Sequence, residues 1–224
     1  ADYNMSHNSH FLLASFMPGN NPAKPRKNPA QSRSRATVEA ILDATAHILV
    51  NDGLAAASTN RIAEKAGVSI GSLYQYFPNK GALIAALRRR HAEAMRATIL
   101  QLAGPAASAP LPQAVRSFIH ALMQAHRIDP QLHRILALEA PRSDFADSRS
   151  DIDHDLRNAI CALLESRRNE ILPTDLPLAA AMLVRLTDAL IHAAIIDNTL
   201  DATPQAVEDE IVRVVLRYLQ GKVA

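Results

Sequence analysis

The chain is poor in cysteine and in aromatic residues, and both shortages narrow what it can be. It has a single cysteine, Cys161, so no disulfide can form within it, as is usual in a reducing compartment. It has no tryptophan and only nine phenylalanine and tyrosine residues. No apolar run approaches the roughly 18 residues of a membrane span, and no signal-peptide pattern is found. Because 48% of the residues are hydrophobic, the chain can still bury a core, and we expect a folded cytoplasmic protein.

The net charge of +2 hides an uneven distribution along the chain. Residues 18–100 contain twelve Lys and Arg against five Asp and Glu, whereas residues 101–224 contain twelve against sixteen. A basic first part favours a polyanionic partner, and an acidic second part favours a different task.

Helical periodicity begins at Arg35 and continues to the end of the sequence, with no convincing strand alternation. Residues 1–33 have no periodicity and read as a flexible basic tail. The stretch "GPAASAPLP", Gly104 to Pro112, is the clearest interruption. We expect an all-α fold of about nine helices, near residues 35–50, 58–66, 69–76, 79–102, 112–127, 130–140, 144–171, 175–198 and 204–220.

Several helix ends carry capping residues. Ser58 or Thr59, Ser69 and Asn79 can begin helices, and Asp129-Pro130 and Thr203-Pro204 combine a cap with a proline in the first turn. Gly53, Gly67 and Gly221 can end helices in a left-handed conformation.

Three of the nine aromatic residues, Tyr74, Tyr76 and Phe77, gather in one short segment. This segment follows "AGVS", Ala66 to Ser69, which joins two short helices as in a helix-turn-helix motif. The second helix of such a motif enters the DNA major groove with its N-terminus first. Leu73 and Phe77 are expected to pack inward, against residues such as Ile41, Ile62 and Leu83. The two tyrosines and Lys80 are expected to face DNA.

The segment Ser34 to Leu87, above all "AEKAGVSIGSLYQYFPNKGAL", resembles the DNA-binding domain of TetR family transcriptional regulators. The resemblance implies a homodimeric repressor that binds a palindromic operator and is released by a small molecule. It implies a DNA-binding domain at 34–80 and an effector-binding and dimerisation domain at 81–224. It carries DNA contacts over to Arg33, Arg35, Thr59, Ser69, Gly71, Ser72, Tyr74, Tyr76 and Lys80. Gly81 departs from the family, in which a larger or acidic residue is common, and it weakens a helix start by up to about 1 kcal/mol.

The second part of the chain shows little family signature, so its candidate effector-binding residues rest on apolar positions and histidines. They are Met95, Ile99, Phe118, Leu122, His126, Phe145, Ile160, Leu164 and His192. Because aromatic rings are few there, we expect an aliphatic or a small polar-apolar ligand rather than a flat cationic drug.

No catalytic or cofactor-binding pattern stands out, and we expect neither an enzyme nor a cofactor. His120 and His126 are six residues apart and do not share a helix face, and "DIDHD", Asp151 to Asp155, is interpreted as a solvated helix end, so no metal site is expected. The alternatives are a helical enzyme or small-molecule carrier with an incidental helix-turn-helix, and an activator or nucleoid-type DNA-binding protein.

The helices near 175–198 and 204–220 have more apolar residues than one core can use, which predicts that they form a homodimer interface. The residues expected to be left for the partner include Leu183, Leu186, Leu190, Ile211, Val215 and Leu219.

Overall fold

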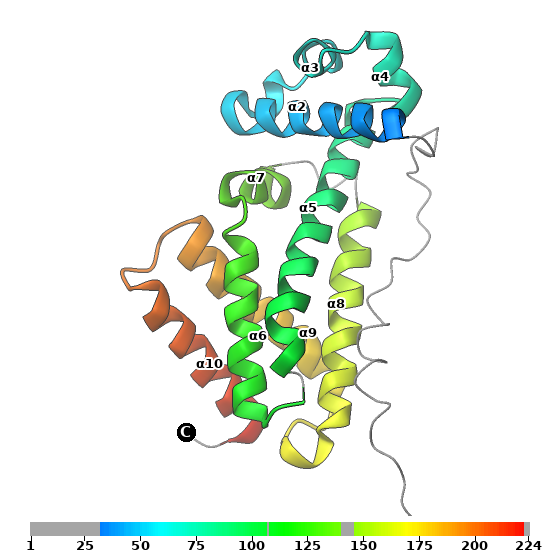
Figure 1. Cartoon of the computed structure of the whole chain (residues 1–224). Coiled ribbons are helices and arrows are strands. Elements are labelled where there is room, and N and C mark those ends of the chain that lie inside the picture. The colour runs from blue at the N-terminus through cyan, green and yellow to red at the C-terminus, as the bar shows by residue number, and fades with distance from the viewer. Residues whose placement is uncertain (1–31, 107, 140–145, 222–224) are drawn as a thin grey trace, which may run out of the picture. The chain divides into compact units, whose positions relative to one another are not determined.

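A computed structural model describes residues 32–106, 108–139 and 146–221 (Figure 1). These residues form α-helices and short 3-10 and π turns, with no strand among them, so the all-α prediction is confirmed. The chain divides into two compact units. The described residues of the first unit are 32–93, 129–139 and 146–149, and those of the second are 94–106, 108–128 and 150–221. The first unit thus also takes in 81–93 and a segment after Asp129, which we had expected in the second domain.

The first unit is built on α2 (Ser32–Ala56), α3 (Thr59–Ala66), α4 (Ile70–Tyr76) and the start of α5 (Lys80–Ala103). Inside α2, Gly53 has a non-helical backbone with φ of 79°. The Ser58 hydroxyl accepts a hydrogen bond from the Arg61 N–H, and the Asn79 side chain accepts one from the Ala82 N–H, as the capping pattern predicted.

The core of the first unit confirms the prediction for Leu73 and Phe77. Both are almost fully buried, in one cluster with Ile41, Ile62 and Leu83. The same cluster includes Leu132, Ile135 and Leu136, which come from α7 (Pro130–Arg134) and the π turn Ile135–Glu139. Asp129 caps α7 through the Leu132 N–H, with Pro130 in the first turn.

The second unit contains the rest of α5, the 3-10 turn Gly104–Ala106, α6 (Leu111–His126), most of α8 (Ala146–Ser166), α9 (Leu176–Ile191) and α10 (Pro204–Gln220). A 3-10 turn, Arg168–Glu170, follows α8, and a π turn, His192–Ile196, extends α9. Thr203 caps α10, and Gly221 ends it with φ of 67°. The core lies between α6, α9 and α10, with Leu164 from α8.

Four of the six residues that we expected at a dimer interface are core residues instead. Leu183, Ile211, Val215 and Leu219 are buried within their own unit, so that part of the prediction is wrong. A helix can bury a wide stripe in its own core when neighbours flank it on two sides, and the sequence does not give the position of those neighbours. The large apolar residues that α9 exposes are instead Leu178 and Met182, at 58% and 56%.

The segment Leu176–Ile196 is long and apolar enough to cross a membrane, with a mean hydropathy of 1.7. Our expectation of no such segment therefore overlooked it. However, Ala179, Ala180, Leu183 and Ile191 are buried in the core of the second unit. A core helix of a folded domain accounts for this composition.

Candidate nucleic-acid interface and effector pocket

The turn between α3 and α4 has the geometry that the helix-turn-helix prediction requires. Gly67 adopts a left-handed conformation, with φ of 68° and ψ of 30°, and its N–H bonds to the carbonyl groups of Ala63 and Glu64. Val68 packs against the core of the first unit. The Ser69 hydroxyl accepts a hydrogen bond from the Ser72 N–H, 3.0 Å away, and so caps α4.

Besides Tyr76, five of the predicted DNA contacts lie at the beginning of α3 and along α4. Ser69 and Gly71 are exposed, and Ser72 and Thr59 are half-buried. The Tyr74 side chain is 42% exposed, and its hydroxyl lies 3.1 Å from the Thr59 Oγ1. This hydrogen bond joins the two helices at an exposed surface. Small side chains at the front of α4 would let the helix approach base edges closely.

Tyr76 and Lys80 have partners within the first unit. Only 8% of Tyr76 is exposed, and its hydroxyl donates to the Ser34 Oγ, 3.2 Å away. The Lys80 Nζ donates to the Leu54 carbonyl oxygen at 2.5 Å. Sequence reasoning missed these two intramolecular roles because each partner is more than 20 residues away. Contact of either residue with DNA stays a prediction.

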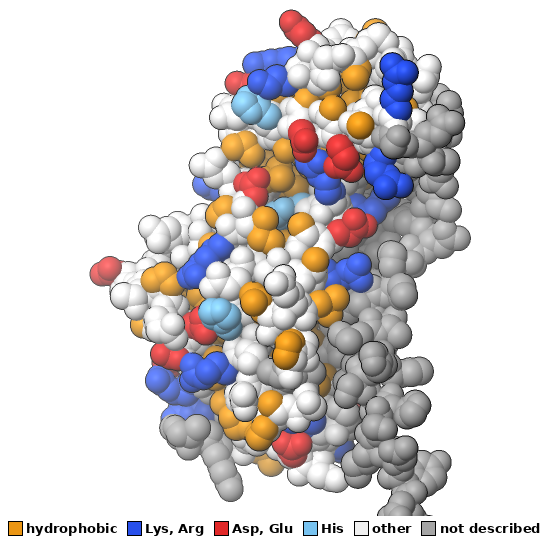
Figure 2. All heavy atoms as spheres, viewed as in Figure 1, with side chains coloured by type: hydrophobic (Ala, Val, Ile, Leu, Met, Phe, Trp, Pro, Cys, Tyr) orange, Lys and Arg blue, Asp and Glu red, His pale blue; other side chains and the backbone are white. Residues whose placement is uncertain are grey.

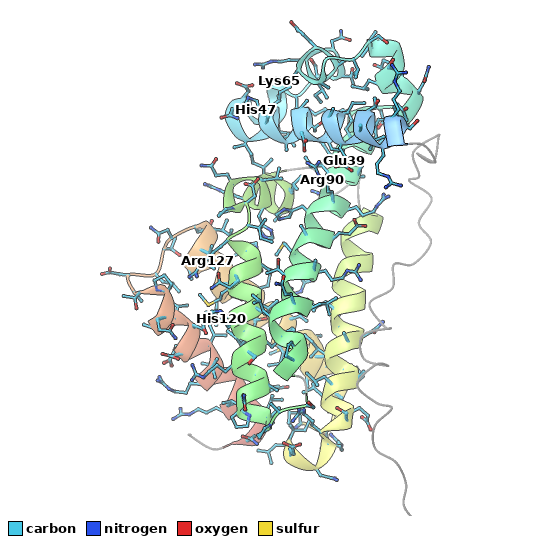
Figure 3. The ribbon with its side chains drawn as sticks, viewed as in Figure 1. Glu39, His47, Lys65, Arg90, His120 and Arg127 are labelled. Atoms are coloured by element: carbon cyan, nitrogen blue, oxygen red, sulfur yellow. The ribbon has the colours of Figure 1, made fainter. Side chains whose placement is uncertain are left out.

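The basic residues of the first unit differ in what surrounds them. Arg90 donates to Glu39 Oε2 at 3.0 Å and to Asp43 Oδ1 at 2.7 Å, and Figure 3 labels Arg90 and Glu39. Arg61 forms an ion pair with Asp52. Figure 2 shows acidic and basic side chains interspersed on one face of the molecule. Arg33 and Arg35, at the start of α2, are exposed.

A half-buried imidazole pair also lies in the first unit. The His91 Nε2 is 3.0 Å from the His133 Nδ1, so one ring donates a hydrogen bond to the other. Burial lowers the pKa of His91, and the charge of Asp129 opposes this shift.

A cavity in the second unit is the candidate effector pocket. Its volume is about 60 Å³. Among the described residues, its walls are apolar except for Arg167 and Thr187. The described lining residues are Leu111, Ala114, Val115, Phe118, Ile119, Ile160, Leu163, Leu164, Arg167, Leu183, Thr187, Val215 and Leu219.

Three of the nine predicted effector residues, Phe118, Ile160 and Leu164, line this cavity. Leu122 is buried in the same core, and Ile99 packs against it. Met95 is half-buried, and Phe145 lies outside the described residues. The polar wall residues, Arg167 and Thr187, were missed. Arg167 follows α8, and Thr187 is one polar residue in a long apolar helix, so no local pattern distinguishes either of them.

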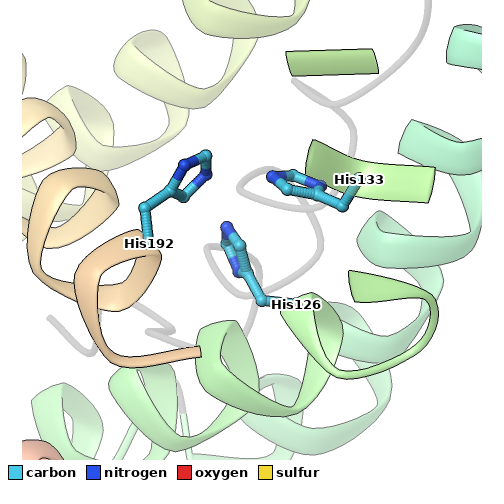
Figure 4. Close-up of side chains that lie close together, drawn as sticks. All are labelled: His126, His133 and His192. Atoms are coloured by element: carbon cyan, nitrogen blue, oxygen red, sulfur yellow. The ribbon is translucent and has the colours of Figure 1, made fainter. Parts of the chain in front are cut away.

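His126 and His192 do not line the cavity but lie against each other. Their ring centroids are 5.4 Å apart in an edge-to-face arrangement, and Figure 4 shows both side chains. The His126 Nδ1 donates to the Leu122 carbonyl oxygen at 2.8 Å, and the His192 Nε2 is 3.4 Å from Asp188. A ring nitrogen of each lies within 4.8 Å of one of the other. Imidazoles at this distance could share a cation, so the absence of a metal site stays a prediction.

Comparison with known proteins identifies both parts of the chain. Residues 41–87 match the family model described as bacterial regulatory proteins, tetR family. Residues 110–219 match the model described as tetracyclin repressor-like, C-terminal domain.

Individual relatives agree with these matches. The uncharacterized HTH-type transcriptional regulator YvkB of Bacillus subtilis (strain 168) is 42% identical over 67 residues. That match covers 30% of this chain and 35% of YvkB, so the chain spans about a third of that relative's length.

Solved structures are similar over a larger part of the chain. The flavonoid-responsive regulator FrrA is 26% identical with a TM-score of 0.64, and the similarity covers 84% of this chain and 98% of FrrA. The fatty acid degradation regulator FadR of Bacillus halodurans has a TM-score of 0.66 at 19% identity, over 80% of this chain and 94% of FadR, which shows the fold alone. Since two models of one family account for most of the chain, the protein belongs to the TetR family of transcriptional regulators.

Proposed function

We propose that the protein is a ligand-responsive repressor that binds a palindromic operator as a homodimer and works in the cytoplasm. The observation that carries this proposal is the exposed surface of α3 and α4, where Ser69, Gly71 and Tyr74 are accessible on a helix held by a complete helix-turn-helix core. Base edges would be contacted from the front of α4, and phosphates from Arg33 and Arg35.

The homodimer is proposed from the faces of α9 and α10 that the core does not use. Leu178 and Met182 on α9 and Tyr218 on α10 are large, apolar and exposed. A second copy of the same surface would cover them, as in a two-fold interface. Two-fold symmetry of the protein would then require an operator with two related half-sites.

Release by an effector is proposed to act through α5. Residues 80–93 of this helix belong to the first unit and residues 94–103 to the second. An effector in the cavity that favours one position of residues 94–103 would also bias Lys80 at the other end of the helix. Half-sites lie about 34–36 Å apart. If the separation of the two α4 helices changes, one of these helices no longer reaches its half-site.

The test is binding of the full chain to the DNA upstream of its own gene, compared with random DNA of equal length. Fluorescence anisotropy should show tighter binding to the upstream DNA, with an affinity that falls steeply as salt rises, by a log–log slope of about −0.9 per phosphate neutralised. Equal binding to both DNAs, or an affinity that does not change with salt, would contradict operator recognition. A bound segment with one unpaired half-site would contradict the dimer.

Reciprocity tests the switch separately from DNA binding. A molecule that weakens operator binding by some factor must itself bind more weakly, by the same factor, when operator is saturating. Effector affinity that is equal with and without operator would rule out release by this route. Transcription of a reporter in the presence and absence of the protein distinguishes repression from activation.

A further inference from the structure

We infer that the cavity of the second unit takes a compact, electrically neutral, mostly apolar ligand, with room for at most one hydroxyl or N–H donor. Only the statement that this ligand is the effector rests on the proposed function. The choice between a neutral, an anionic and a cationic ligand follows from the two polar groups in the wall.

The Thr187 hydroxyl already uses its hydrogen as a hydrogen-bond donor within α9. Its Oγ1 lies 2.8 Å from the Leu183 carbonyl oxygen and 3.3 Å from that of Val184, within α9. A hydroxyl carries one hydrogen and two lone pairs. Thr187 can therefore accept a hydrogen bond from a ligand donor, but it has no proton left for a ligand carboxylate.

Arg167 is held at the wall by groups of the protein. Its Nη2 donates to the Ala109 carbonyl oxygen at 2.8 Å, and its Nη1 lies 3.6 Å from the Glu170 carboxylate. The side chain is 10% exposed. Glu170 already balances the guanidinium charge, so an anionic ligand would lose its water and compete with a carboxylate in place.

A cationic ligand fits the cavity no better. No Asp or Glu occurs among the described residues that line it, and the charged residue among them, Arg167, is positive. Phe118 is the only aromatic residue among the lining residues, so the stacked rings that hold flat cations are not available. A small apolar cavity of this kind can stay dry and bind compact hydrocarbon-like molecules.

The test uses three probes with one carbon skeleton: cyclohexylmethanol, cyclohexanecarboxylate and cyclohexylmethylammonium. Binding to the unsubstituted 224-residue chain is measured by titration calorimetry near neutral pH. We expect the alcohol to bind at least about tenfold more tightly than either ion, because burial penalises the charged forms. The Arg167→Gln variant should keep this order.

A filled cavity provides the matched control. Ala114 lies in the wall, so Ala114→Leu places three more carbon atoms there and should abolish binding of the alcohol. Val115→Leu is the second filling variant if the first does not fold, as judged by circular dichroism. Alcohol binding that persists in a folded, filled variant would show that it binds elsewhere and would overturn the inference.

Two further results would also overturn it. One is carboxylate or ammonium binding as tight as that of the alcohol. The other is no binding of any of the three probes up to the limit of solubility. Operator release is measured apart from these titrations: an alcohol that fills the cavity without weakening DNA binding supports the ligand class and contradicts the proposed switch.

Discussion

At the scale of single residues, Leu73 and Tyr74 are neighbours in the chain that differ in burial. Leu73 is fully buried, so Leu73→Ala should lower the free energy of unfolding by about 2–5 kcal/mol. Tyr74 is 42% exposed, so Tyr74→Ala should change stability by no more than about 0.5 kcal/mol while it weakens operator binding and blurs sequence preference. Urea unfolding and DNA-binding anisotropy measure the two effects. Wild-type operator preference in Tyr74→Ala would exclude this side chain from base reading.

His91 should make stability depend on pH. Burial lowers its pKa in the folded protein below the ordinary value of 6.5, so below that pH the unfolded chain binds more protons than the folded one. The free energy of unfolding should therefore be highest above pH 6.5, as far as His91 is concerned. It should fall as the pH drops from there through the lower, folded-state pKa. Denaturant titrations at a series of pH values would measure this slope. His91→Gln should flatten it, and an unchanged slope in that variant would assign the effect to another group.

At the scale of elements, the turn between α3 and α4 depends on Gly67. A Cβ added there would meet no atom within 4 Å, so the cost of a side chain is backbone strain alone. Gly67→Ala should destabilise the first unit by about 1–2 kcal/mol, because L-residues disfavour the left-handed conformation. Gly67→Asn should cost less, since asparagine tolerates that conformation. Equal losses of stability in the two variants, measured by thermal unfolding, would contradict this account.

The elements that could be predicted from sequence are those whose signals are local. Ser58, Ser69, Asn79, Asp129 and Thr203 cap helices as expected, because a cap involves only the next turn of the chain. The family matches confirm that the chain is a transcriptional regulator rather than an enzyme.

What could not be predicted depends on residues that are distant in sequence. The Tyr76 hydroxyl donates a hydrogen bond to Ser34, and the core of the first unit includes Leu132 and Leu136 from beyond α6. The wall of the cavity combines residues from four helices and the position after α8, so only Phe118, Ile160 and Leu164 of it were anticipated. Periodicity shows that a helix has an apolar face, but it does not identify the surface that covers this face.

At the scale of the whole molecule, the exposed apolar face of α9 should hold two copies together. Met182→Glu places a charge at a residue that is 56% exposed in one chain, so it should leave the fold intact and shift the protein to monomer. Leu102→Glu is the matched control, because Leu102 is 40% exposed but lies at the end of α5. Analytical ultracentrifugation measures both. A stable dimer of Met182→Glu, or a monomer of Leu102→Glu, would place the interface elsewhere.

The burial of α10 also has a consequence for how the protein is made. Val207, Ile211, Val215 and Leu219 close a core whose other walls, such as Ile119 and Leu183, precede them in the chain. During translation, α2, α3 and α4 leave the ribosome long before α10. The apolar faces of α6 and α9 remain exposed to solvent until α10 is made. A message cut short before Thr203 would therefore yield a chain with a complete helix-turn-helix segment and an open hydrophobic core. Chaperones and proteases recognise such a surface, so the cell would remove this fragment.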